Sequence, residues 1–467
     1  MVMVHYMPWF VSQPYSGSWG WHWTMNHFNP NVSNPTNGEQ QIASWYYPLI
    51  GPYDSADPVV LEYHVLLMKL GGIDGAVVDW YGMDNFNDYA LNNARTLDLF
   101  NYTRKAGLQF SLCYEDATIK QEVTGGFITA AGAVDHAQQT MLYAQTNFFD
   151  DASFLRWQTS PVLLNFGPQY FTNSSDWSSN FSGLNASNQP AFFTEDNRLA
   201  PAGTGAFDWP PMSLSQTNAQ SPNEPVLSDA VLNSYLTAFD QKAGAWPAFV
   251  SSAFPRFHDI YAQAGVEPSF GYLDDQNGAT FQETLTRAMT NHSTFIQVVT
   301  WNDFGEGTIV EPTVQYGYRD LGVIQDFRRQ YLDASFPFHT NDLLLPLRLY
   351  NLRKQYGTTN PVLSAELDRV FTNIVSSNLT AAALQLTGME SNVPVIYNAL
   401  ASDGQLQFSV GGFLSGAGLQ VQSSPTLAAG GWQTVATLPA GTNLAVFSVS
   451  MPTNSPAMFF KIQAAGP

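Results

Sequence analysis

Three observations in this 467-residue sequence predict a (β/α)8 TIM barrel followed by a small C-terminal β-sandwich. Strand-like and helix-like segments alternate over about the first 340 residues. Several of these strands end in acidic or aromatic residues, as strands of a barrel enzyme do. From about residue 389 the pattern changes to short strands separated by Gly, Ser and Pro. We therefore predict a barrel domain over 1–385 and a β-sandwich accessory domain over 389–467.

The elements of the barrel follow from short apolar runs bounded by turn residues. The helix that begins at Asp57-Pro58 ends at Gly71-Gly72, and further helices are predicted at 86–106, 131–147, 228–243 and 279–291. A doubly wound open sheet is the alternative, but no Gly-rich phosphate loop supports it. The eight predicted strands span residues 3–10, 75–81, 108–114, 161–166, 191–194, 205–209, 248–252 and 295–301.

Helical sequence continues after the barrel to about residue 376, with Leu363, Leu367, Val370 and Ile374 spaced for one face. A structural or attachment role is the simplest expectation for the module beyond it. Carbohydrate binding is the alternative, favoured by Trp432 and a few Phe residues. The short strands of the module are predicted at 393–397, 405–410, 418–422, 432–437, 445–449 and 458–462.

The composition points to a neutral polyhydroxy ligand. Charged residues make up 12% of the chain and aromatic residues 14%. Flat rings stack on sugar faces, and amides bond their hydroxyls. The formal net charge of −20 argues against nucleic acid and anionic membrane as partners. We expect a monomer that binds carbohydrate.

Cysteine and histidine usage gives no sign of a metal or cofactor. The one cysteine, Cys113, lies in an apolar run and is predicted to be a buried small hydrophobe, so no intrachain disulfide forms. The eight histidines are dispersed, without a His-x-x-x-His pair. We therefore expect neither a metal nor a cofactor.

The N-terminus shows no signal peptide, because strand-like sequence begins at Val2. We expect that an export signal preceded residue 1 and was removed, which makes the protein secreted or periplasmic. No apolar run approaches the ~20 residues of a membrane span.

The most informative stretch is Thr-Trp-Asn-Asp-Phe-Gly-Glu-Gly-Thr-Ile-Val-Glu-Pro at 300–312. It follows the eighth predicted strand, and its Phe-Gly step favours a turn. Asp303 and Glu306 are the predicted catalytic carboxylates, because acids at the exit of a buried strand mark barrel active sites. The structural alternative is an Asp that caps the next helix and a solvated Glu.

Residues at the other strand ends, and in the aromatic loop after the first strand, are predicted to bind substrate. The carboxyl ends of barrel strands converge on one face, so these side chains should share one cleft. The predicted substrate-binding residues are His5, Tyr6, Trp9, Trp21, His22, Trp23, Tyr47, Asp79, Trp80, Tyr81, Glu115, Asp208, Trp209, Trp301, Asn302 and Glu311.

Together these motifs resemble glycoside hydrolase family 99, which includes endo-α-mannosidases. The similarity covers about residues 3–315, the whole barrel. The matching stretches are His5-Tyr6-Met7-Pro8-Trp9, Trp21-His22-Trp23, Tyr47–Pro58, Gly72–Gly75, Asp79-Trp80-Tyr81, Glu115 and Glu306-Gly307-Thr308. The Trp-Asn-Asp-x-Gly-Glu core also resembles family 71, the α-1,3-glucanases. The C-terminal module resembles sandwich modules of secreted bacterial enzymes.

The resemblance implies hydrolysis of an α-glycosidic bond by an exported enzyme. In family 99 the first acid, a Glu, deprotonates the sugar's own 2-hydroxyl, and the second is the general acid/base. Those positions are Asp303 and Glu306 here, with Phe304-Gly305 between them in place of Trp-His. An Asp also suits the family 71 pattern, in which a carboxylate pair activates water. A non-catalytic glycan-binding protein on a degenerate barrel is the third alternative.

Overall fold

The computed structural model describes residues 1–356, 361–391, 395–402, 405–411, 418–428, 430–438, 445–450 and 458–464. The chain divides into two compact units, Met1–Thr340 and Asn341–Pro467. The first unit is shorter than the barrel domain predicted over 1–385, because helices after Thr340 group with the C-terminal strands.

Within residues 1–340, all of which are described, eight parallel strands form a nearly closed barrel. Their spatial order is β7-β6-β5-β3-β2-β1-β11-β8, and a bridge between Phe207 and Val250 joins the two ends. The predicted TIM barrel is therefore confirmed. The strands are β1 Val2–Tyr6, β2 Gly75–Trp80, β3 Gln109–Tyr114, β5 Ser160–Asn165, β6 Ala191–Glu195, β7 Gly205–Phe207, β8 Ser251–Ala253 and β11 Ile296–Val298.

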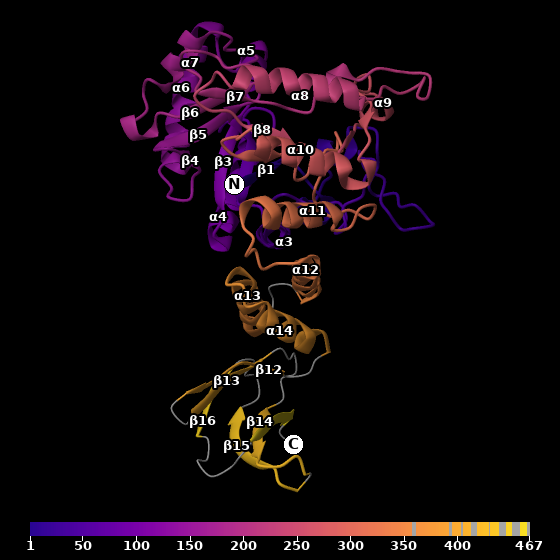
Figure 1. The fold of residues 1–467 in the computed structure, drawn as a ribbon, viewed down its shortest axis with the longest axis vertical. Coiled ribbons are helices and arrows are strands. Elements are labelled where there is room, and N and C mark those ends of the chain that lie inside the picture. Colours follow the sequence, from indigo (N-terminus) through magenta and orange to yellow (C-terminus); the bar gives the residue numbers. More distant parts are fainter. Residues whose placement is uncertain are drawn as a thin grey trace. The chain divides into compact units, whose positions relative to one another are not determined.

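Helices lie around these strands, with α8, α10 and α11 stacked in order along one side (Figure 1). The first long helix begins where Asp57 Oδ1 accepts a hydrogen bond from Val59 N at 2.9 Å, and it ends at Gly72 with φ 84°. The helices are α3 Pro58–Gly71, α4 Tyr89–Ala106, α5 Ala117–Thr124, α6 Ala133–Ala144, α7 Ser174–Phe181, α8 Asp229–Ala243, α10 Ala279–Thr290 and α11 Arg319–Phe327.

Short helices and strands lie in the connections between the main elements of the barrel. Helices α1 Gln13–Ser16 and α2 Trp21–Thr24 lie in the long loop after β1, and α9 Tyr261–Ala264 follows β8. Strand β4 Arg156–Trp157 pairs with β5, and β9 Phe257–His258 pairs with β10 Tyr272–Leu273, both antiparallel.

The two-residue period of the strands divides their side chains into an inner and an outer set. One buried cluster contains the inner residues Met3, Val77, Cys113, Leu164, Phe193 and Phe207, so Cys113 is a buried hydrophobe as predicted. Two positions further along the strands, the same face carries His5, Asp79, Glu115, Phe166 and Trp209. The barrel interior therefore leads directly to the polar and aromatic residues at its carboxyl face.

The described residues of the second unit form three α-helices and two antiparallel sheets. The face of α13 that carries Leu363, Leu367, Val370 and Ile374 is buried, as its spacing predicts. Helix α14, Leu379–Ser391, was not predicted from the sequence, and the predicted strand start at 393–394 lies outside the described residues. The other helices are α12 Leu344–Tyr356 and α13 Pro361–Val375.

The sheets of this unit fit the predicted β-sandwich. Each has three strands, in the orders β12-β13-β16 and β15-β14-β17. Their strands are β12 Val395–Ser402, β13 Gln405–Gly411, β14 Leu419–Ser424, β15 Gln433–Leu438, β16 Ala445–Ser450 and β17 Phe459–Ala464. Among the described residues, none of the helices has the length and apolarity that a membrane crossing requires.

Candidate active site

A cavity of about 200 Å³ lies at the carboxyl ends of the barrel strands. Four carboxylates line it: Asp79 from β2, Glu115 after β3, and Asp303 and Glu306 after β11. Asp79 and Asp303 are buried, whereas Glu115 and Glu306 are partly exposed. The rest of the wall is mainly rings, from His5, Trp9, Phe10, Trp21, His22, Tyr81, Phe166, Trp209 and Tyr261.

A wider groove of about 690 Å³ continues from this cavity. Cavity and groove have five wall residues in common: Trp9, Trp21, His22, Tyr81 and Glu115. The groove adds polar side chains, including Asn87, Asp88, Tyr89, Thr118 and Gln121. The site is therefore an elongated cleft in which Asp303 and Glu306 line the cavity and not the groove.

A tight turn fixes the position of Asp303. Its backbone N–H donates to Thr300 Oγ1 at 2.7 Å, and its Oδ1 accepts from the backbone N–H of Glu306 at 3.0 Å. No helix begins here, because the next one, α11, starts at Arg319. The Asp303 side chain therefore stabilises the loop that contains both acids. It does not cap a helix, so the helix-cap alternative does not describe its position.

Two glycines let this turn pack tightly. Gly307 has φ 70°, and a Cβ there would lie 2.7 Å from the His258 carbonyl oxygen. A Cβ on Gly305 would lie 2.9 Å from the Met25 methyl group. The Glu306 carbonyl accepts from His258 N at 2.8 Å, which anchors the backbone of the second acid to the segment after β8.

The two acids of the pair differ in their proton affinity. Burial raises the pKa of Asp303 to about 6, although hydrogen bonds from the backbone N–H groups of Glu306 and Gly305 act against the shift. Burial, followed by the negative charge of Asp303, raises the pKa of Glu306 well above its usual value. Asp303, whose ionised form accepts these backbone hydrogen bonds, therefore gives up its proton more readily than Glu306 does.

The other two acids of the cavity, Glu115 and Asp79, also have raised pKa values. Burial, and then the charges of Asp116 and Glu195, raise the pKa of Glu115 to about 8. Burial raises the pKa of Asp79 well above its usual value, with Glu115 and Asp303 as the next causes. Like charges so close together cannot all ionise, so Asp303 carries the first negative charge of the group.

Aromatic rings form much of the cavity wall. Trp9 and His22 stack with ring centroids 4.1 Å apart and planes 6° from parallel, and His5 meets Trp209 edge-on at 4.9 Å. Burial lowers the pKa of both His5 and His22 to about 3, so both rings are neutral at physiological pH. Neutral, flat surfaces of this kind suit sugar rings.

A buried polar network connects the turn to β1 and α3. Asn302 Oδ1 accepts from Met7 N at 2.8 Å, and its Nδ2 donates to the Met7 carbonyl at 2.9 Å and to Tyr53 Oη at 3.0 Å. Tyr53 donates to Glu311 at 2.7 Å, and His64 lies 3.2 Å from the other oxygen of Glu311. These contacts fix the chain on both sides of the acid pair.

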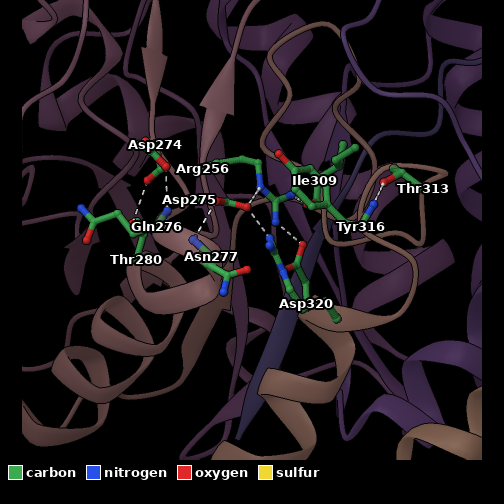
Figure 2. A network of polar contacts seen from close by, with 11 residues as sticks. Arg256, Asp274, Asp275, Gln276, Asn277, Thr280, Ile309, Thr313, Tyr316 and Asp320 are labelled. Atoms are coloured by element: carbon green, nitrogen blue, oxygen red, sulfur yellow. Dashed lines mark hydrogen bonds and ion pairs between the residues drawn. The ribbon is translucent and has the colours of Figure 1, made fainter.

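A second network, around Arg256, holds the segment after Glu306 (Figure 2). The buried guanidinium donates to the Ile309 carbonyl at 3.0 Å, pairs with Asp320 and lies 3.6 Å from Asp275. Its carbon lies 3.8 Å from the centroid of the Tyr316 ring. Since Ile309 is only three residues after Glu306, this cation holds the backbone of the loop that carries the acid pair.

The structure brings ten of the predicted site residues together around the cavity. They are His5, Trp9, Trp21, His22, Asp79, Tyr81, Glu115, Trp209, Asp303 and Glu306. Each barrel-strand member of this set belongs to the inner face of its strand, which explains why these side chains reach the same space.

The remaining predicted residues lie outside the lining of this cavity. Tyr6, Trp80 and Asp208 alternate with inner residues, so they face outward: Tyr6 Oη lies 3.0 Å from His64 Nδ1, and Trp80 donates to Asn93 at 3.0 Å. Asp208 accepts from the Ser252 backbone at 2.6 Å, which links β7 to β8.

The other five of these residues pack behind the site or in a different groove. Trp23 is buried and donates to the Tyr53 carbonyl at 2.7 Å, and Trp301 is buried against His64. Tyr47 lines a separate groove of about 440 Å³. The last two, Asn302 and Glu311, belong to the polar network described above.

Several residues that line the cavity, or that hold the segments around it, were not singled out as site residues from the sequence. Phe166, Tyr261, Met25 and Gly305 line the cavity, and Tyr53, His64 and Arg256 hold its frame. The alternation of the fourth predicted strand could have indicated Phe166, which follows Leu164 by two residues. Met25, Tyr53, Arg256 and Gly305 lie between the named elements, and Tyr261 begins the short helix α9, so their positions depend on the path of the whole chain. His64 lies on the predicted helix α3, but the local pattern does not indicate its partner Glu311.

Known proteins with similar sequences include endo-alpha-1,2-mannosidases and proteins like them. A glycoprotein endo-alpha-1,2-mannosidase-like protein from Danio rerio is 33% identical over 88 residues, which is 17% of this chain and 20% of that protein. The glycoprotein endo-alpha-1,2-mannosidase of Mus musculus is 20% identical over 348 residues, 66% of this chain and 67% of that protein. No protein-family model matches the chain.

A solved structure supports the fold. The family 99 endo-alpha-mannosidase of Bacteroides thetaiotaomicron superposes with a TM-score of 0.50 at 18% identity, over 70% of this chain and 97% of that one. The resemblance to endo-α-mannosidases of glycoside hydrolase family 99, indicated by the sequence motifs, is thus confirmed.

Proposed function

We propose that this protein is a glycoside hydrolase that cleaves an α-glycosidic bond within a glycan or polysaccharide, as an endo-α-mannosidase does. The observation that carries the proposal is the acid pair: Asp303 and Glu306 share one cavity and have pKa values pushed apart. Two carboxyl groups with different proton affinities supply a base and an acid at the same pH.

Glu306 is the general acid in this proposal, since burial and the charge of Asp303 raise its pKa and favour its protonated form, and since it is partly exposed and lines the cavity. It donates that proton to the leaving glycosidic oxygen as the bond to the anomeric carbon breaks. Asp303, ionised, accepts a proton either from the sugar 2-hydroxyl, which then attacks the anomeric carbon, or from a water that attacks directly. In the first route Glu306 later deprotonates the water that opens the intermediate.

The shape of the cleft supports cleavage within a chain. The groove beyond Trp9 and Tyr81 extends the binding surface past the acids, so more than one sugar unit has room on that side. Stacked rings along it offer apolar faces to pyranose units, and the amides of Asn87 and Gln121 offer hydrogen bonds. We propose export as the cellular setting of this activity, because polymeric glycans are encountered outside the cell.

Substrate release assays test the proposal. Reducing sugar should appear from yeast α-mannan, and Asp303→Asn and Glu306→Gln should each lower the rate at least ~10²-fold. Glu283→Gln, an exposed acid on α10, is the matched control and should leave the rate unchanged. Release from α-1,3-glucan alone would favour a family 71-like glucanase. Binding without release from either polymer would indicate a glycan-binding protein instead.

A 2-deoxy substrate separates the two chemical routes. Only the neighbouring-group route needs the 2-hydroxyl, so loss of turnover with retained binding supports that route. Normal turnover of the 2-deoxy sugar would assign Asp303 to activation of water.

A further inference from the structure

Three side chains from separate segments meet outside the cavity. Asp84 lies in the loop between β2 and α4, Glu122 on α5 and His136 on α6. His136 Nε2 lies 2.9 Å from Asp84 Oδ2 and 3.4 Å from Glu122 Oε2. Their candidate ligand atoms all lie within 4.8 Å of one another.

The contacts among these side chains do not satisfy Glu122. The residue is 1% exposed, and its Oε2 has no hydrogen-bond partner among the residues that the structure describes. A single ring nitrogen carries at most one proton, and His136 Nε2 is nearer to Asp84. A buried carboxylate oxygen is therefore aimed at the cluster without a donor, and leaving such a group unpaired is costly.

We propose that Asp84, Glu122 and His136 bind a divalent cation, for which zinc is the best chemical match. Zinc takes imidazole nitrogen at about 2.0–2.1 Å and carboxylate oxygen at about 2.0–2.2 Å, which places neighbouring ligands of a tetrahedron about 3.3 Å apart. The two distances from His136 Nε2, 2.9 and 3.4 Å, lie on either side of that spacing. Asp84 and His136 are partly exposed, so water can complete the coordination.

The cation would join three segments that are not adjacent along the chain. Gln121, next to Glu122, accepts from Tyr89 Oη at 2.7 Å, and it lines the groove together with Asn87. A bound cation would thus brace α5 and the loop after β2, which form the outer wall of the groove. This role is structural, and it holds whatever the cavity acids catalyse.

The test is zinc binding by the full chain. We expect one zinc per chain after dialysis against a trace of Zn²⁺, measured by elemental analysis, and a thermal midpoint that rises with zinc concentration. Asp84→Asn and His136→Gln should each weaken binding by about 100-fold or more, since each loses a ligand. His292→Gln, an exposed histidine, is the matched control and should bind zinc as the parent does.

One further measurement checks that the variants fold, and another reports the coordination geometry of the bound metal. Circular dichroism checks that both variants fold; if one fails to fold, the other still reports on the site. Cobalt(II) substitution should give the visible absorption of a tetrahedral nitrogen–oxygen site in the unmodified protein. Absence of stoichiometric zinc, or equal binding by the parent, Asp84→Asn and His136→Gln, would overturn the proposal.

Discussion

Replacing Asp303 by Asn distinguishes a catalytic carboxylate from a structural one, because the two roles predict opposite changes in stability. A side chain whose main role is to order its turn contributes about 1 kcal/mol, which the substitution would remove. A buried carboxylate with a raised pKa instead lowers the stability of the folded state, and the substitution relieves that cost.

The magnitude follows from the proton affinity of Asp303. Its pKa rises from 3.8 to about 6 on folding, a shift of about two units, and each unit corresponds to about 1.4 kcal/mol. The folded state binds this proton more tightly than the unfolded state, so stability falls as the pH rises from 3.8 to about 6. Above that window the full cost, roughly 3 kcal/mol, is present.

Urea denaturation at two pH values measures this effect. At pH 7 we expect Asp303→Asn to have a free energy of unfolding equal to the parent's or higher by up to about 3 kcal/mol. At pH 4 the gain should nearly vanish, because Asp303 is then protonated in the folded parent. At pH 7, where Asp303 of the parent is ionised, turnover of α-mannan should fall at least ~10²-fold in the variant. A variant that is less stable at pH 7 yet retains turnover would refute the catalytic assignment.

Further predictions concern the pH dependence of kcat/KM, the buried network around Arg256 and the stacking surface of Trp9. The value of kcat/KM should fall about tenfold per pH unit below pH 6, as Asp303 becomes protonated, and should fall again at high pH as Glu306 loses its proton. Glu115→Gln removes a negative charge that raises the pKa of Glu306, so the high-pH limb should move to lower pH. Arg256→Met removes the buried cation that Asp275 and Asp320 share with Arg319, leaves the Ile309 carbonyl without its donor, and should cost about 1–3 kcal/mol in urea unfolding. Trp9→Ala removes a stacking surface and should raise KM for oligosaccharides about tenfold, with a smaller change in kcat.

The barrel was predictable from the sequence because its strands are short apolar runs with clear ends, and because its helices carry caps. Asp57 and Gly72, for example, mark the ends of α3 as predicted. Helix α14 was missed because its apolar residues spread around the helix and leave no clear face. The boundary between the two units, after Thr340, depends on tertiary contacts, which no local sequence pattern encodes.

Which residues reach the cavity was predictable only in part. The rule that strand ends converge selects neighbours such as Asp79 and Trp80 together, but the two-residue period puts them on opposite faces. Only Asp79 lines the cavity, while Trp80 packs outward and bonds Asn93. Residues outside the strands, such as Tyr261 at the start of α9, reach the site through the path of the chain after β8, which depends on the whole fold.

The distribution of positive charge explains why the cavity retains protonated acids. The buried guanidinium groups of Arg95 and Arg256 pair with Asp54, Asp275 and Asp320, away from the cavity. Among the ion pairs of the described residues, none joins an arginine or a lysine to the four cavity acids. A cation beside them would lower their pKa values and remove the proton that we propose Glu306 donates. The buried arginines therefore stabilise the segments around the site, Arg256 by holding the loop that carries Asp303 and Glu306. With no cation beside these acids, the proposed acid and the proposed base are available together.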